Sequence, residues 1–331
     1  VTLPFGKEKM KVTIPDNRLN GILVSKAHEF QADKPEEEIV KDALAHPIHS
    51  KRLRELAKGK DNIVLIASDH TRPVPSKVIM PGILEEIKAG NPNAKITILI
   101  ATGFHRPTTR EELIYKFGED IVDREDITFA VHKSHENADM VELGTLPSGG
   151  KLKINKIAAE ADLLISEGFI EPHFFAGFSG GRKSVLPGVS SAATVMANHC
   201  SEFIASEYAR TGVLEGNPIH RDMIYAAEQA KLAFIINVVL DENKKVIRAY
   251  AGDFNEAHRE GCRFVDQMSG VDAIPSDIVI STNGGYPLDQ NIYQSVKGMT
   301  AAEASCNPGG VIIMVSSCID GHGGQSLYDT F

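Results

Sequence analysis

Short apolar runs recur along the chain, and stretches of helical length with mixed polarity separate them. The runs at residues 62–67, 95–101 and 161–166 predict buried strands. Helices are expected between these runs, at residues 76–88 and 110–117. Continuous apolar strands that alternate with helices are typical of a parallel sheet covered on both faces, so the pattern predicts an α/β fold.

A different pattern follows the third apolar run. Residues 234–240 and 246–250 flank a polar turn, and they predict a β-hairpin near the end of a first domain. The stretch at residues 269–276 contains glycine, proline and serine, which favour turns and loops. It is therefore the candidate linker between two domains.

The α/β pattern begins again after this linker. Strands are expected at residues 277–281 and 311–315, with residues 300–304 in a helix between them. Two strands and one helix make a thin domain, so we expect the second domain to be truncated. We therefore predict two α/β domains with mainly parallel sheets and an active site in the cleft between them. The N-terminal domain spans residues 1–270, and residues 271–331 form the start of the second domain.

Composition is that of a globular protein. Hydrophobic residues make up 42% of the 331 positions, and the formal net charge is −9. No basic stripe suggests nucleic acid, and no apolar run approaches the ~20 residues of a membrane helix. The first eleven residues are strand-like and then charged, unlike a signal peptide. Four widely spaced cysteines predict reduced thiols and a cytoplasmic protein: Cys200, Cys262, Cys306 and Cys318.

The most informative passage combines a histidine, a glycine-rich turn and a lysine at residues 171–184. Glycines let backbone N–H groups approach an anion, and Lys183 can serve as a counter-charge or a nucleophilic amine. The string nearly matches a phosphate-binding P-loop, but Arg182 stands where that motif needs glycine. A phosphate is therefore expected, and an ordinary ATP or GTP site is not. The candidate cofactor-binding residues here are Gly180, Gly181, Lys183 and Ser184. Alternatively, the glycines only turn the chain.

Polar residues follow each of the first three predicted strands. Asp69 and Arg72 follow the first, His105 follows the second, and His173 follows the third together with the glycine-rich turn. Ligands bind outside the carboxyl ends of strands in open parallel sheets, so these residues are expected around one crevice. The Arg72 guanidinium suits a carboxylate or a phosphate. Asp69 could equally be a turn or capping residue.

Histidines supply the other candidate chemistry. His105 and His173 are the candidate acid/base pair, because imidazole titrates near neutral pH and each follows a strand. His199 is a candidate ligand for nickel, zinc or copper, although one histidine is weak support for any metal. His132 and His135 lie in a charged stretch and are expected to be solvated.

Gln294 and Lys297 follow a turn-rich loop in the second domain. They lie three positions apart on the expected helix, and therefore on one face of it. Lys297 could close over an anionic substrate. The alternative is an ordinary surface lysine.

Taken together, these residues resemble the nickel-dependent lactate racemase family. The resemblance extends from about residue 4 to the end of the chain. It is carried by five motifs in the same order: SDHTRP at 68–73, ATGFHR at 101–106, GFIEPHFFAGFSGGRKSVLPG at 168–188, ANH at 197–199 and YQSVKGM around 293–299.

The resemblance implies a cofactor and roles for individual residues. Family members carry a pyridinium mononucleotide with two sulfur substituents, which binds nickel as a pincer. The lysine that holds this cofactor covalently corresponds to Lys183, and the nickel-binding histidine corresponds to His199. The two catalytic histidines correspond to His105 and His173. Four further positions match the cofactor and substrate pocket: Asp69, Arg72, Gln294 and Lys297.

The function implied is racemisation of a small 2-hydroxy acid, with D- and L-lactate as the expected substrates. The implied mechanism moves a hydride reversibly to the cofactor while the histidines exchange the hydroxyl proton. Cofactor-biosynthesis proteins are expected as transient partners, and nucleic acid and membrane are not. The family pattern also places a tryptophan near the substrate, whereas this chain contains none. Other 2-hydroxy acids therefore stay open as substrates.

Two other functions compete with this interpretation. One is a non-catalytic protein that binds a phosphate ligand or nucleotide through the glycine-rich loop. The other is a hydrolase in which His199 and a carboxylate hold zinc. A single histidine ligand argues against the zinc hydrolase.

Overall fold

The computed structural model describes residues 1–26 and 30–323. These residues form two compact units. The smaller unit comprises the described residues within Val1–Glu29, Thr71–Pro73 and Met268–Phe331, and the larger unit comprises those within Phe30–His70 and Val74–Gln267.

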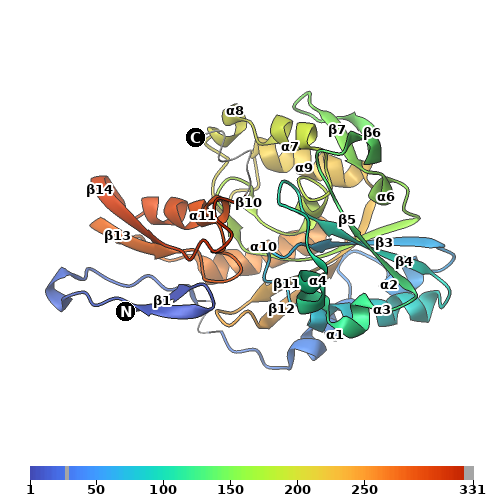
Figure 1. Cartoon of the computed structure of the whole chain (residues 1–331), viewed down its shortest axis with the longest axis horizontal. Coiled ribbons are helices and arrows are strands. Elements are labelled where there is room, and N and C mark those ends of the chain that lie inside the picture. The colour runs from blue at the N-terminus through green and yellow to red at the C-terminus, as the bar shows by residue number, and fades with distance from the viewer. Residues whose placement is uncertain (27–29, 324–331) are drawn as a thin grey trace. The chain divides into compact units, whose positions relative to one another are not determined.

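A six-stranded sheet forms the centre of the larger unit (Figure 1). In spatial order it consists of β12 Val246–Gly252, β11 Leu232–Leu240, β8 Leu163–Phe169, β3 Asn62–Ser68, β4 Lys95–Ala101 and β5 Ile127–Val131. All neighbouring strands are parallel except β11 and β12. Chain order runs outward in opposite directions from β3 and β8. The carboxyl ends of these two strands therefore flank the switch point at which open α/β sheets bind ligands.

Helices cover both faces of this sheet (Figure 1). On one face pack α1 Glu36–Ala45, α2 Leu53–Leu56 and α3 Ser76–Gly90, and over the other lie α6 Lys156–Ala159, α7 Ala192–Asn198 and α9 Pro218–Gln229. The remaining helices of the unit are α4 Arg110–Phe117, α5 Glu119–Val122, α8 Ser201–Ile204 and α10 Glu256–Ser269. Among the residues that are described, no helix has the length and apolarity needed to cross a membrane.

Covering both faces explains why the strands are apolar at successive positions. Ile63, Val64, Leu65 and Ile66 of β3 are all fully buried, although they alternate between the two faces. Burying one such side chain stabilises the fold by about 1.5–3 kcal/mol.

A capping box begins α4. The Thr109 side chain accepts a hydrogen bond from the N–H of Glu112 at 3.4 Å, and the Glu112 carboxylate accepts one from the N–H of Thr109 at 2.9 Å.

Smaller elements extend from the main sheet. They are the antiparallel pairs β6 Met140–Thr145 with β7 Lys151–Asn155 and β9 Pro172–His173 with β10 Gly177–Phe178, and the 3-10 turns η3 Asn137–Asp139 and η4 Gly181–Ser184. The pairing of β9 with β10 places His173 opposite Gly177. The glycine-rich passage is therefore a tight hairpin followed by one 3-10 turn.

The α/β fold predicted for the first domain is confirmed. The three predicted strands correspond to β3, β4 and β8, and the two predicted helices correspond to α3 and α4. The predicted hairpin is the antiparallel pair of β11 and β12. Sequence periodicity missed the two-residue strands β9 and β10, because two residues are too few to show a period.

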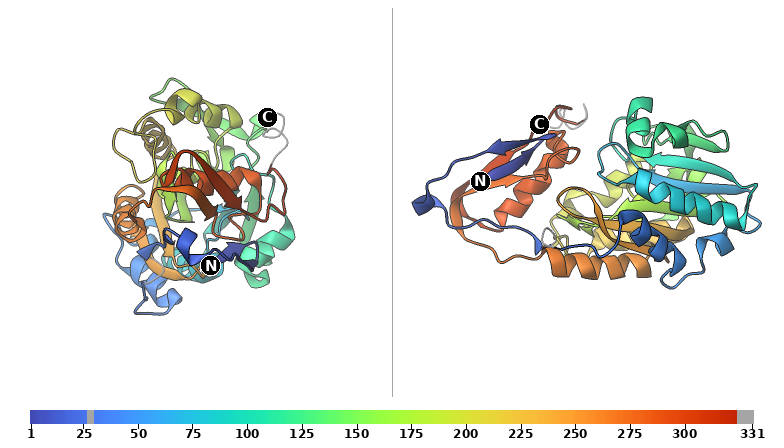
Figure 2. Two further views of the ribbon diagram at one scale, coloured as in Figure 1. Left: turned by 90° about the vertical axis from the view of Figure 1, so that its left-hand side faces the viewer. Right: turned by 90° about the horizontal axis from the view of Figure 1, so that it is seen from below.

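The smaller unit contains a second α/β arrangement (Figure 2). It consists of β13 Ser276–Thr282 and β14 Cys306–Val315, which pair in parallel, with α11 Ile292–Glu303 between them, and of the hairpin β1 Thr2–Phe5 with β2 Glu8–Lys11 and the 3-10 turn η1 Asp16–Arg18. The strands expected at 277–281 and 311–315 are confirmed, as is the helix.

The N-terminal hairpin belongs to the smaller unit, whereas the sequence analysis placed it in the first domain. Gly6 donates its N–H to Oδ2 of Asp289 at 2.7 Å and accepts a hydrogen bond from the N–H of Tyr286 at 2.8 Å. Strand β1 of the hairpin also contacts β13. An apolar pattern predicts a strand but not its partner, so this long-range pairing was not visible in the sequence.

Candidate active site

Candidate residues gather at the carboxyl ends of β3, β4 and β8. Asp69 follows β3, His105 follows β4, and His173 and Lys183 follow β8. These strands are neighbours in the sheet, in the order β8-β3-β4. The larger unit therefore brings these four residues to one edge of its sheet, as the strand pattern predicts for His105, His173 and Lys183. Arg72, which was expected in the same crevice, belongs to the smaller unit.

Asp69 and His105 form a direct pair. Nδ1 of His105 lies 2.6 Å from Oδ2 of Asp69, and Asp69 is only 1% exposed. A carboxylate can only accept, so Nδ1 of His105 carries the proton and Nε2 is the basic nitrogen of the neutral ring. The sequence left Asp69 open as a turn residue. The structure shows its carboxylate bonded to a candidate catalytic histidine.

His173 has the opposite arrangement of ring nitrogens. Its Nδ1 accepts a hydrogen bond from the N–H of Ala176 at 3.3 Å, so in the neutral ring the proton resides on Nε2. The ring stacks on Phe174, with centroids 4.9 Å apart, and meets Phe175 edge to face at 4.6 Å. His173 is 6% exposed, and the two phenylalanine rings provide apolar contacts to its imidazole.

The Phe175 ring connects three candidate residues. It contacts the His173 ring, and it meets the His199 ring edge to face with centroids 5.0 Å apart. Nζ of Lys183 lies 5.6 Å from the centroid of the same ring. One aromatic side chain therefore places an acid/base candidate, a metal-ligand candidate and a candidate attachment lysine around itself. Phe175 carried no signal in the sequence beyond its place inside the motif.

His199 is the residue directly after α7. Its Nδ1 is buried and has no hydrogen-bonding partner among the described residues. Burial, and next the positive charge of Lys183, lower the pKa of His199 to about 3. The ring is therefore neutral near pH 7, which is the form that binds a metal ion.

The glycine-rich turn is closely packed against the protein itself. Gly180 and Gly181 have φ of +75° and +52°, and a Cβ on Gly181 would lie 2.7 Å from Cγ of His258. The N–H of Gly181 donates to Oδ1 of Asn237 at 2.7 Å, and the N–H of Lys183 donates to the Gly180 carbonyl at 3.1 Å. Two donors that a P-loop would direct at phosphate are therefore already bonded within the protein.

Ser184 closes the same turn. Its Oγ donates to the carbonyl of Gly181 at 2.9 Å. The structure thus supplies a packing reason for Gly180, Gly181 and Ser184. Their assignment to a cofactor pocket stays a prediction.

Three further candidates lie in the smaller unit. Gln294 and Lys297 are on α11, three residues apart as predicted, and Gln294 is 1% exposed. Arg72 belongs to the same unit and donates to Oγ1 of Thr71 at 2.7 Å. Placing Arg72 with Gln294 and Lys297 is a tertiary result, because more than 200 positions separate them in the sequence.

His132 corrects an expectation from the sequence. It was expected to be solvated, but it is fully buried, and its Nε2 donates to the carbonyl of Ser190 at 3.0 Å. Its Nδ1 accepts a hydrogen bond from Asn155 at 3.2 Å. Burial lowers the pKa of His132 to about 4. The charged residues next to His132 in the sequence suggested exposure. The ring instead has a structural role, because its bond to Ser190 holds the segment that follows Lys183.

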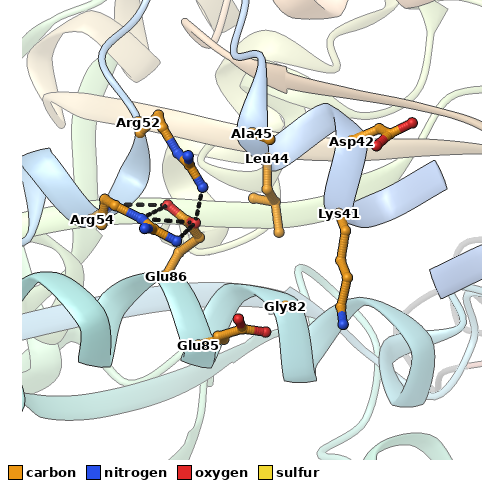
Figure 3. Close-up of a pocket in the computed structure, with 9 residues that line it drawn as sticks. All are labelled: Lys41, Asp42, Leu44, Ala45, Arg52, Arg54, Gly82, Glu85 and Glu86. Carbon is orange, nitrogen blue, oxygen red and sulfur yellow. Dashed lines mark hydrogen bonds and ion pairs between the residues drawn. The ribbon is translucent and has the colours of Figure 1, made fainter. Parts of the chain in front are cut away.

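A separate pocket lies between α1, α2 and α3 (Figure 3). Its most prominent feature is Glu86, which accepts hydrogen bonds from both Arg52 and Arg54. Arg54 lies ahead of β3 in the chain and Glu86 lies near the end of α3, so this pocket is near the amino ends of the strands. It is lined by Lys41, Asp42, Leu44, Ala45, Arg52, Arg54, Gly82, Glu85 and Glu86. None of these is a candidate site residue.

A metal ion held by the protein alone would need several ligands in one place. Within residues 1–26 and 30–323, no three His, Cys, Asp or Glu side chains gather in that way. Among these residues, His199 is thus not part of a ready-made set of three protein ligands.

Comparison with known proteins identifies the family. Residues 5–212 match the lactate racemase N-terminal domain, and residues 271–331 match the lactate racemase C-terminal domain. A lactate racemase from Thermoanaerobacterium thermosaccharolyticum is 60% identical over 331 residues, which are 100% of this chain and 77% of that protein. A lactate racemase from Lactiplantibacillus plantarum is 60% identical over 328 residues, covering 99% of this chain and 77% of that protein.

Solved structures agree with this result. The structure of the lactate racemase apoprotein from T. thermosaccharolyticum superposes with a TM-score of 0.91 at 60% identity, covering 100% of this chain and 77% of that chain. A Thermotoga maritima protein superposes with a TM-score of 0.70 at 22% identity, covering 86% of this chain and 72% of that chain, which shows a shared fold alone. The chain belongs to the lactate racemase family.

Proposed function

We propose that this member of the lactate racemase family interconverts D- and L-lactate with the help of a nickel-pincer cofactor. The observation that carries the proposal is the cluster around Phe175. It brings Lys183, His173 and His199 together at the end of β8, beside the strand end that holds the Asp69–His105 pair. Identity of 60% over the whole chain supports the same reaction.

The side chains at this cluster suit such a cofactor. Lys183 supplies an amine for covalent attachment, and His199 supplies a neutral imidazole whose buried Nδ1 has no partner among the described residues. A single imidazole suits a nickel ion whose other ligands come from an organic group. When bound, the cofactor supplies a reversible acceptor for the hydride on C2 of the substrate.

The two histidines would handle the proton of the substrate hydroxyl. Nε2 of His105 can accept it, because Nδ1 is bonded to Asp69, and the Asp69 carboxylate would stabilise the resulting imidazolium. His173 presents its proton on Nε2 and can donate a hydrogen bond to the substrate oxygen. The pair thus offers one acceptor and one donor, as proton exchange on a 2-hydroxy acid requires.

Binding of the substrate carboxylate is assigned to the smaller unit. Arg72 and Lys297 carry positive charge and Gln294 carries an amide, which suit a carboxylate and a developing oxyanion. That the substrate binds in a cleft between two domains stays a prediction from the sequence. The same holds for a cytoplasmic location and for transient contact with cofactor-biosynthesis proteins.

The decisive experiment is production of the protein in a host that makes the cofactor. Intact mass and peptide mapping of wild type are expected to show a nickel- and sulfur-bearing adduct on Lys183, and Lys183→Ala is expected to lose both the adduct and lactate racemisation. Lys156→Ala is the matched control, because Lys156 is exposed and its Nζ lies 3.8 Å from the Glu160 carboxylate. Racemisation by Lys183→Ala at the wild-type rate would overturn the proposal.

A further inference from the structure

Arg182 is the largest fully buried side chain of the larger unit, with an exposed fraction of 0%. Its Nη2 donates to the carbonyl of Ala176 at 2.7 Å, and its Nη1 donates to the carbonyls of Phe178 at 2.8 Å and Gly180 at 3.3 Å. Nε donates to Nδ1 of His220 at 3.0 Å. The guanidinium is therefore surrounded by the loop that leads to Lys183.

No carboxylate is among the hydrogen-bonding partners of Arg182 in the described part of the chain. Burial lowers the pKa of Arg182 to about 10, so the side chain stays positive near pH 7. Its histidine neighbours add no second positive charge, because burial lowers the pKa of His220 to about 3 and that of His258 well below the usual value, and both rings are therefore neutral near pH 7. Backbone carbonyls are thus the groups that balance the buried cation.

This arrangement reverses the logic of a P-loop. A P-loop directs backbone N–H groups inward to an external phosphate. Here, alternate carbonyls at 176, 178 and 180 point inward to a guanidinium that the chain itself supplies. The loop encloses a cation of its own chain. This explains why arginine stands at the position where a P-loop has glycine.

The guanidinium also connects to His173. Ala176 is bonded on both sides, since its carbonyl accepts from Arg182 at 2.7 Å and its N–H donates to Nδ1 of His173 at 3.3 Å. At the other end of the loop, Arg182 directly precedes Lys183. The position of one side chain therefore constrains both a candidate catalytic histidine and the candidate attachment lysine.

We propose that Arg182 is a positioning residue that fixes the Nε2–H form of His173 and the location of Lys183. This inference rests on the proposed function, in which those two residues act. Lysine at position 182 would keep the charge but lose the planar fork that reaches alternate carbonyls. The loop would then no longer hold Ala176 against His173.

The test compares Arg182→Lys with Arg210→Lys. Arg210 is a matched control, because its Nη1 also donates to three backbone carbonyls, those of Ile204, Ser206 and Ala209, but at an exposed position outside the loop. In cofactor-free, ¹⁵N-histidine-labelled protein, Arg182→Lys is expected to lose the single Nε2–H signal of His173 and to speed hydrogen exchange at the Ala176 amide. Arg210→Lys is expected to change neither.

In protein loaded with cofactor, Arg182→Lys is expected to lower kcat by about 100-fold, as small misplacements at an active site do. The adduct on Lys183 is expected to decrease, and the pH profile of kcat to shift. Wild-type kcat, adduct, His173 signal and Ala176 exchange in a folded Arg182→Lys would overturn the inference. If the variant does not fold, rotation of the Arg182 guanidinium is measured by NMR in wild-type protein. Slow rotation supports a guanidinium held by the loop carbonyls, and free rotation overturns the inference.

Failure of the proposed function would look different. Wild-type protein that carries the adduct but racemises no 2-hydroxy acid would refute the proposed function. The His173 signal and the Ala176 exchange rate would still decide the role of Arg182.

Discussion

Nδ1 of His105 lies 2.6 Å from Oδ2 of the buried Asp69, whereas Nδ1 of His173 accepts a backbone N–H. The two candidate catalytic imidazoles are therefore held in opposite neutral tautomers. Each tautomer is set by the group bonded to Nδ1, and not by the histidine itself. The two rings therefore present different groups, a basic Nε2 on His105 and an Nε2–H on His173.

Replacing Asp69 by Asn is expected to reduce kcat by about 10²-fold or more, the usual range for a lost acid/base function. The amide cannot stabilise an imidazolium, and it can favour the wrong tautomer of His105. Chiral chromatography of lactate measures the rate, and intact mass checks that the adduct on Lys183 is retained. Asp162→Asn is the control, because the Asp162 carboxylate lies at an exposed site and accepts hydrogen bonds from the backbone N–H groups of Asp61 and Asn62. An unchanged rate in loaded Asp69→Asn would refute the role assigned to the pair.

Replacing His199 by Ala is expected to lower nickel content while the organic adduct on Lys183 remains. The reason is that the neutral imidazole with its buried Nδ1 is the proposed metal ligand, and the attachment is made elsewhere. Metal analysis by mass spectrometry and peptide mapping measure the two quantities separately. His135→Ala is the control at an exposed histidine. Stoichiometric nickel in loaded His199→Ala would contradict the assignment.

Stability is expected to fall as pH drops below about 6.5, because His132 is buried as a neutral ring. Its pKa is lowered to about 4 in the folded protein from 6.5, so the unfolded chain binds a proton first. The stability is present above pH 6.5 and is lost on acidification, by roughly 3 kcal/mol at pH 4 for this residue. Urea unfolding at several pH values measures it. A shallower pH dependence is expected for His132→Gln than for His135→Gln, and equal slopes would argue against the buried neutral ring.

Replacing Gly181 by Ala is expected to destabilise the larger unit by about 2–4 kcal/mol, from a left-handed backbone and a clash with His258. Gly59→Ala is the matched control. Gly59 has φ of +69°, yet a Cβ there would meet nothing within 4 Å, so only the cost of about 1 kcal/mol for the backbone remains. Chemical unfolding of both variants isolates the clash. Equal losses would show that the turn has room for a side chain.

Much of the larger unit was predictable because its strands and helices follow from patterns among neighbouring residues. The apolar runs at β3, β4 and β8 are continuous, so strands and helices followed from periodicity, and the rule for parallel sheets placed Asp69, His105 and His173 at one edge. The motifs then indicated the family, which full-length identity of 60% confirms. Residue chemistry alone supported Lys183 equally as a phosphate counter-charge or a nucleophile.

The tertiary structure decided which residues far apart in the sequence come into contact. Arg182, His220 and His258 carry no common pattern in the sequence, because their contacts join residues 38 and 76 positions apart. His132 is buried although its neighbours are charged, since Ser190 supplies its partner from 58 positions away.

The sequence by itself determined the strand and helix pattern, the parallel sheet, and which residues could perform chemistry at the strand ends. Only the tertiary structure decided the tautomers of His105 and His173, the cation inside the loop of Lys183, and the grouping of Arg72 with α11. The physical reason is that periodicity records which face of an element is buried, whereas a hydrogen bond depends on which distant group arrives there.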